Sequence, residues 1–182
     1  MKRKLKPKVI IILISLLLIA GIVFAVYKFG SKESKTTNND IIGTIEGFGY
    51  TKNIRATEVF RNEFENLRKI LTAKEIDYEA YAGSLSKLFI IDFYTLSNKL
   101  NRYDVGSLEY IDPRIVENFN LKALDTIYRF VENNTDNSRT LELPEVRSVQ
   151  VNEIVETTFT IDGEELEAIR VTLSWEFVRL RI

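Results

Sequence analysis

Acid–base chemistry in this chain depends on carboxylates and tyrosines, because the sequence contains no histidine and no cysteine. Histidine is the commonest general base, and histidine and cysteine are the preferred zinc ligands. A catalytic site without them needs another nucleophile or a pair of titratable groups in a pocket. The side chains that could supply such a pair lie between residues 92 and 112: Asp92, Tyr94, Tyr103, Asp104, Glu109, Tyr110 and Asp112.

Asp92 is the strongest candidate, because it lies within the apolar stretch LFIIDFYTL. A carboxyl group among such neighbours can have a raised pKa and act as an acid or a base. Buried carboxylates are more often paired with another group for structural reasons. We therefore favour a structural role for Asp92 and predict that the protein is not an enzyme.

Metal and cofactor signatures are missing from the sequence. No residues have the spacing of a zinc site, and none follow the order of a calcium-binding loop. Gly43, Gly47 and Gly49 are spaced unlike a dinucleotide-binding or phosphate-binding loop, so a short strand or an irregular segment is predicted there. We predict no catalytic residue, no cofactor and no metal site.

Aromatic residues offer a second kind of site. A stripe of them could line a ligand pocket, although such stripes more often form part of a core: Tyr78, Tyr81, Phe89, Phe93 and Tyr94. Tyr103 and Tyr110 could instead form a protein-docking surface. Trp175 is predicted to pack between the sheet and the helices, with its indole N–H bonded to a carbonyl group.

Helices dominate the first part of the predicted fold. Apolar residues recur every three or four positions in residues 56–73, which predicts an amphipathic helix. Asp77 is a plausible N-cap for a second helix over residues 78–100, whose centre at residues 88–93 should be the most buried part. Asp112 and Pro113 predict the start of a third helix.

Strands dominate the C-terminal part. From residue 140 onward the apolar residues alternate with polar ones, which predicts antiparallel strands. Asp162 and Gly163 form a strong hairpin-turn signal, and a change of parity near residues 177–178 suggests a bulge or bend. Helices followed by an antiparallel sheet predict an α+β fold in which helices pack on a curled sheet.

The N-terminal residues suggest a membrane anchor. Five basic side chains precede an uncharged run, and this pattern predicts a cytoplasmic tail (1–8), a transmembrane helix (9–29), a tether (30–41) and an extracytoplasmic domain (42–182). A cleaved export signal is the alternative, but its small-residue cleavage pattern is missing. A cysteine-free outer domain is more typical of a bacterial than of a eukaryotic secreted protein.

Charge argues against nucleic acid as a partner. Of the 25 basic residues six lie within residues 1–28, whereas all 26 acidic residues follow, which leaves the rest of the chain near −7. A nucleic-acid-binding surface needs a basic patch to neutralise phosphates. The predicted partners are therefore the membrane, other envelope proteins and a second copy of the chain.

The order of elements resembles a known family. It is similar to the bitopic inner-membrane assembly factor of type IV secretion and conjugation machines, in the helices DYEAYAGSLSKLFIIDFYTLSNKL and DPRIVENF and in the strands around Ala168, Val171 and Trp175. The resemblance implies a nuclear transport factor two-like (cystatin-like) fold and a non-catalytic scaffold that self-associates. A membrane-tethered small-ligand-binding domain is the alternative, and an enzyme using Asp92 or Tyr94 is less favoured.

Overall fold

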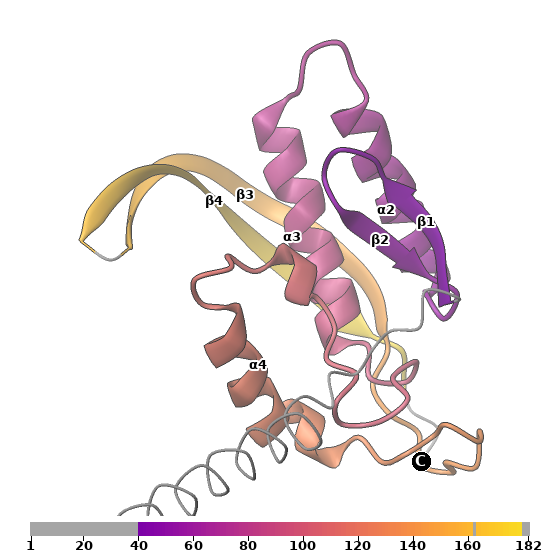
Figure 1. Cartoon of the computed structure of the whole chain (residues 1–182). Helices are drawn as coiled ribbons and strands as arrows, with labels where there is room; N and C mark the ends of the chain where they lie inside the picture. Colours follow the sequence, from indigo (N-terminus) through magenta and orange to yellow (C-terminus); the bar gives the residue numbers. More distant parts are fainter. Residues whose placement is uncertain (1–39, 162, 180–182) are drawn as a thin grey trace, which may run out of the picture. The chain divides into compact units, whose positions relative to one another are not determined.

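The computed structural model describes residues 40–161 and 163–179, and Figure 1 shows how their elements are arranged. In chain order they are β1 (Ile41–Ile45), β2 (Tyr50–Asn53), α2 (Glu58–Leu71), α3 (Tyr78–Tyr94), the 3-10 helix η2 (Leu108–Tyr110), α4 (Val116–Asp125), the 3-10 helix η3 (Ile127–Phe130), β3 (Val146–Ile161) and β4 (Glu164–Phe177). Helices and antiparallel hairpins are both present, which confirms the α+β class.

The prediction of a transmembrane helix is corrected by this structure. Among residues 40–161 and 163–179, no helix combines the length and the apolar character needed to cross a bilayer. The segments predicted as tail (1–8) and span (9–29) lie outside the described residues, as does most of the predicted tether. The last two residues of that tether are described: Asp40 forms an ion pair with Arg55 at 2.9 Å, and Ile41 begins β1.

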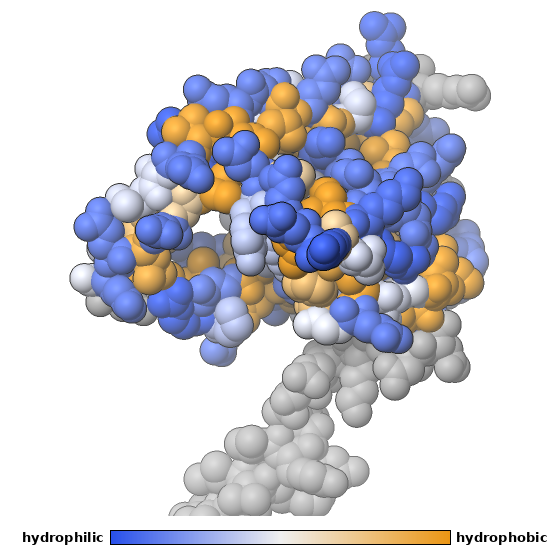
Figure 2. All heavy atoms as spheres, turned by 90° about the horizontal axis from the view of Figure 1, so that it is seen from above, coloured by the Kyte–Doolittle hydropathy of each residue, from blue (hydrophilic) through white to orange (hydrophobic). Residues whose placement is uncertain are grey.

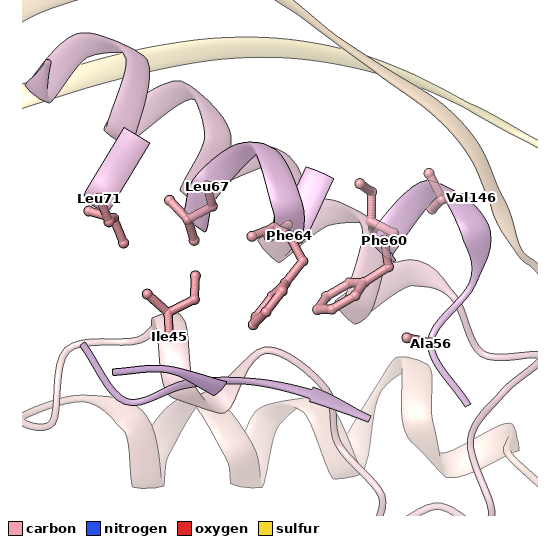
Figure 3. Packing of buried hydrophobic residues seen from close by; sticks show 9 residues of the cluster. Ile45, Ala56, Phe60, Phe64, Leu67, Leu71 and Val146 are labelled. Atoms are coloured by element: carbon pink, nitrogen blue, oxygen red, sulfur yellow. The ribbon is translucent and has the colours of Figure 1, made fainter. Parts of the chain in front are cut away.

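Helix α2 forms as the sequence predicts. Its N-cap is Thr57, whose hydroxyl accepts a hydrogen bond from the Phe60 N–H at 3.3 Å. Basic residues occupy the last turn, where they face the negative end of the helix dipole. The apolar stripe faces the core, where it packs against Ile45 of β1 as seen in Figure 3: Phe60, Phe64, Leu67 and Leu71.

Helix α3 begins as predicted but ends earlier. The Asp77 carboxylate accepts a hydrogen bond from the Ala80 N–H at 2.9 Å, which confirms it as the N-cap. The helix stops at Tyr94 and not at residue 100, because the N–H groups of Leu96 and Ser97 donate to the Pro144 carbonyl instead of to the helix. The centre of α3 is buried as predicted, with Leu88, Ile90, Ile91 and Phe93 all inaccessible or nearly so.

The third predicted helix is displaced toward the C-terminus. Asp112 does not cap a helix with its side chain. Its carboxylate accepts hydrogen bonds from the backbone and guanidinium of Arg114 in a turn. Helix α4 therefore begins at Val116, three residues after Pro113, and ends at Asp125. The backbone at Thr126 departs from helical geometry, so the remaining apolar residues form η3.

Two antiparallel hairpins complete the fold. Strands β1 and β2 are joined through Gly47 and Gly49, both with positive φ angles, so these glycines serve a turn. The predicted series of C-terminal strands is a single long hairpin, β3–β4, whose turn includes Gly163 at a φ of 83°. The bulge expected at 177–178 lies on the opposite strand, between Val146 and Ser148, and a second lies between Val151 and Glu153.

The β3–β4 hairpin packs mainly against α3, through part of its length, with a smaller contact between β3 and α2. Gly83 allows this approach, because a Cβ there would lie 3.4 Å from Ile154 Cδ1. Toward the other end of α3, the Trp175 ring stacks on Tyr94 with 5.3 Å between ring centroids. The predicted packing of Trp175 against a helix is thus confirmed, but the side chain is 38 % exposed and is not enclosed between sheet and helices. Figure 1 shows the turn end of the hairpin extending past α3.

Candidate functional site

Asp92 forms an ion pair with a lysine that the sequence analysis did not single out. Asp92 lies in the last turn of α3, and Lys99 lies in the loop that follows, with 2.6 Å between Asp92 Oδ1 and Lys99 Nζ. The Lys99 side chain is only 7 % exposed, and that of Asp92 is 24 % exposed. A charged amine at this depth requires a nearby counter-charge, which Asp92 supplies.

The second carboxylate oxygen of Asp92 holds the loop before η2. Asp92 Oδ2 accepts hydrogen bonds from the backbone N–H and the hydroxyl of Ser107. The Ser107 hydroxyl also contacts the Phe89 carbonyl at 2.9 Å, and Ser107 has a φ of 66°, unusual for a residue other than glycine. At Gly106, an added Cβ would lie 2.7 Å from the Asp92 carbonyl and Lys99 Nζ. This close packing requires glycine at position 106.

Tyr128 of η3 connects the same loop to α3. Its side chain is fully buried, and its hydroxyl accepts from the Gly106 N–H at 3.0 Å and donates to the Phe93 carbonyl at 2.9 Å. Burial raises the pKa of the Tyr128 phenol, so the hydroxyl stays protonated and able to donate. Asp92, Lys99 and Tyr128 thus connect the end of α3 with the loop before η2 and with η3.

Replacing Tyr128 by phenylalanine is expected to lower the free energy of unfolding by about 1–3 kcal/mol, because two buried backbone groups lose their partner. Urea denaturation followed by circular dichroism measures this change. Tyr78→Phe is the matched control, since Tyr78 is 67 % exposed at the start of α3. Equal stability of the two variants would contradict the role given to the Tyr128 hydroxyl.

A second polar group lies between β2 and η2. The Glu109 carboxylate accepts hydrogen bonds from the backbone N–H and the hydroxyl of Thr51 at 3.1 and 2.8 Å. The rings of Tyr50 and Tyr110 are 5.5 Å apart, and the hydroxyls of Tyr50 and Tyr81 are hydrogen-bonded. These contacts connect the β1–β2 hairpin to η2 and to the loop before it, whose Ser107 is hydrogen-bonded to Asp92.

Titration within this second group follows from its partial burial. Desolvation raises the pKa of Glu109, and the hydrogen bonds from Thr51 oppose that shift. Burial also raises the pKa of Tyr110, and the nearby charges of Glu109 and Asp92 act in the same direction. Within residues 40–161 and 163–179, no group meets the geometric criteria for a hydrogen bond to the buried Tyr110 hydroxyl, although Glu109 lies close enough to influence its pKa. Asp92, Glu109 and Tyr110 are thus the sequence-predicted candidates that the fold brings near one another.

The other candidates lie apart from that group. Tyr94 packs between Phe93 and Trp175, and Tyr103 is exposed beside Arg102. Asp104 pairs with Arg55 at 3.3 Å. The Arg114 side chain holds the pKa of the exposed Asp112 at about 2. None of these contacts joins one of the four candidates to a second carboxylate or tyrosine hydroxyl.

Metal and ligand sites have little support among the described residues. No group of three or more carboxylates there could hold a metal ion. A surface hollow of about 310 Å³ lies beside the loop before β3 and is lined in part by Arg139, Leu141 and Glu145. The Arg139 guanidinium is already engaged by the carbonyls of Lys99, Glu132 and Ser97. The aromatic stripe lies elsewhere, with Phe89 and Phe93 stacked in the core beside Phe119.

The turn end of the β3–β4 hairpin has an exposed apolar surface. Phe159 is 61 % exposed, and its cross-strand neighbour is Leu166. Figure 2 shows apolar atoms along this projecting part and a gap between it and the rest of the described residues. Neither Phe159 nor Leu166 belongs to a core cluster. The core clusters of the described residues therefore do not account for the apolar side chains at this end of the hairpin.

Sequence reasoning missed Lys99, Ser107 and Tyr128, whose polar contacts hold Asp92 and the loop before η2. None of them has a distinctive neighbouring pattern, and each meets Asp92 or its loop only through the tertiary fold. Glycine at position 106 is the one local signal, because a glycine between apolar segments can mark a close approach.

Comparisons with other proteins provide no assignment. The chain matches no family model, no curated protein and no solved structure.

Proposed function

We propose that residues 40–179 form a non-catalytic protein-interaction module whose contact element is the β3–β4 hairpin. The observation that carries this proposal is the exposure of Phe159 on a part of the hairpin that extends past α3. Single exposed apolar residues are normal on protein surfaces, but an apolar group on a projecting hairpin is characteristic of contact sites.

The polar clusters support a scaffold more than a catalyst. Asp92 has a buried cation and two hydrogen-bond donors around it, which leaves little of its carboxylate for a substrate. The carboxylate of Glu109 is similarly engaged by Thr51. Protein partners, including a second copy of the chain, fit this proposal, and nucleic acid does not because the chain beyond residue 28 is acidic.

Photocross-linking tests the contact element directly. Benzoylphenylalanine at position 159 of the full chain, expressed in its own cells, is expected to give one discrete adduct. The matched control places the same probe at Tyr78, an aromatic residue that is 67 % exposed at the start of α3. Equal adduct yields from both positions, or no adduct from position 159, would overturn the proposal.

Phe159→Ser separates contact from stability. Because Phe159 is exposed, the free energy of unfolding should change by no more than about 0.5 kcal/mol. The variant should nevertheless lose the partner that the cross-link identifies, as measured by co-purification with the tagged full chain. A variant that keeps the partner, or that unfolds, would count against the hairpin as a contact element.

We also propose that β3 and β4 are two strands of a nuclear transport factor two-like sheet whose other strands lie outside this hairpin.

The proposal extends to the kind of assembly that the resemblance implies, a secretion or conjugation machine. A strain lacking the gene should lose conjugative transfer or secretion and regain it with the wild-type gene, but not with Phe159→Ser. Restoration by both genes would separate the hairpin from that role.

A further inference from the structure

The β3–β4 hairpin has main-chain groups along its outer edges that no other described segment uses. In an antiparallel pair, alternate residues direct their N–H and C=O groups away from the partner strand. Among the described residues, no backbone group of residues 147–177 is hydrogen-bonded to the main chain outside the hairpin. An extended segment from another molecule can therefore pair with an edge.

The edge of β4 is the more accessible of the two. Strand β3 packs against both α2 and α3, whereas the principal helix contact of β4 is with α3. Two-stranded ribbons are only marginally stable in water by themselves. A third strand added at β4 would extend the sheet without displacing a helix.

Apolar side chains near the turn share one face of the hairpin. Opposed residues of an antiparallel pair point to the same face, as do alternate residues within a strand. Phe159 pairs with Leu166, and the other apolar residues on that face are Ile161, Ala168 and Val155. Thr157, Glu164 and Arg170 lie on the same face. None of the five apolar residues belongs to a core cluster, so an added strand could cover them with its own apolar side chains.

Charge identifies the class of partner. Strand β4 carries four glutamates and one arginine, a net charge of −3, and β3 carries two glutamates and one arginine, a net charge of −1. None of the ion pairs in the described part of the chain involves these glutamates. A basic segment would gain from this field, whereas a second copy would place β4 against a strand of the same charge.

We propose that β4 binds, by strand addition, an extended segment of another protein in which lysine or arginine alternates with apolar residues. This inference rests on the proposed function of the hairpin and names the chemistry of its partner. The main chain supplies the pairing, the exposed apolar face supplies contact area, and the glutamates select for positive charge.

Synthetic peptides test this chemistry with the full chain. The first probe is a decapeptide of alternating lysine and valine. The second replaces every lysine with glutamate, and the third keeps the lysines but carries N-methyl groups on alternate amides, which removes donors for strand pairing. Trp175 in β4 is the single tryptophan of the chain, so its fluorescence reports binding at this strand. We expect the first peptide to bind at least about tenfold more tightly than the other two.

Glutamate variants locate the interaction. E164Q/E165Q/E167Q removes three exposed charges from β4, and should weaken binding of the lysine–valine peptide by about tenfold. E46Q/E75Q/E132Q removes three exposed charges from loops elsewhere and is the matched control. The control should bind as the wild type does, and its equal loss of affinity would show that only net charge matters.

Each remaining outcome overturns a stated part of the inference. Equal binding of the N-methylated peptide would rule out strand addition, and equal binding of the glutamate peptide would rule out a basic partner. Self-association by sedimentation, strengthened by the three β4 substitutions, would assign the edge to a second copy. If no peptide binds but the position-159 adduct persists, the partner chemistry is wrong while the proposed function stands.

Discussion

Replacing Phe64 by alanine is expected to lower the free energy of unfolding by about 3–5 kcal/mol. Phe64 has no exposed surface and lies in the middle of α2, in the core cluster between β1 and α3. Its ring stacks on Phe60 with 6.0 Å between centroids, and the Lys52 amine lies 5.3 Å from its centre. Removing the ring costs burial energy and leaves a cavity that the packed helices cannot fill.

Urea denaturation followed by far-ultraviolet circular dichroism measures this loss. Phe130→Ala is the matched control, because the same ring at position 130 is 65 % exposed. The control should change the free energy of unfolding by no more than about 1 kcal/mol. Since domains of this size are stable by only about 5–15 kcal/mol, Phe64→Ala should leave a measurable unfolded fraction. A cost below that of Phe130→Ala would contradict the assignment of the core.

Asp92→Asn should produce the second-largest loss, about 2–4 kcal/mol. The substitution leaves Lys99 charged and almost inaccessible to water, without the carboxylate that lies 2.6 Å away. Partial exposure of Asp92 places the expected cost below that of a fully buried pair. The double variant Asp92→Asn/Lys99→Met should recover part of the loss, because it removes the unpaired charge as well.

Asp125→Asn is the control for this series, since Asp125 is exposed at the end of α4. Its cost should not exceed about 0.5 kcal/mol. The same variants separate a structural from a catalytic Asp92. A structural role predicts that function in cells follows folded protein level and that the double variant restores both. Loss of function in a well-folded double variant would revive Asp92 as an acid or base.

Local sequence patterns determined several elements of this fold. The three- and four-residue spacing of apolar residues in α2 corresponds to one helical face, and Asp77 can satisfy free N–H groups wherever a helix begins. Glycine at position 163 permits the positive φ of the hairpin turn. Each of these signals acts between residues that are near in sequence, so the sequence alone was sufficient.

Element ends were decided by contacts between distant residues. Helix α3 ends at Tyr94 because the following N–H groups bond to Pro144, about fifty residues away. The late start of helix α4 is an exception, because it follows from a local turn in which Asp112 binds Arg114 instead of capping. Trp175 stacks on Tyr94 of α3 and is still 38 % exposed, a degree of burial that only the tertiary structure defines. The Pro144 carbonyl that ends α3 cannot be identified from a local pattern.

The polar cluster shows the same division. An aspartate within an apolar stretch predicted that Asp92 would need a partner, which is a consequence of the cost of burying a charge. Only the tertiary structure identified Lys99 and Ser107 as its partners and placed Tyr128 on the adjacent loop. Residue types and local spacing determined which groups must be satisfied. Long-range packing decided which partners satisfy them, because that choice depends on where distant segments meet.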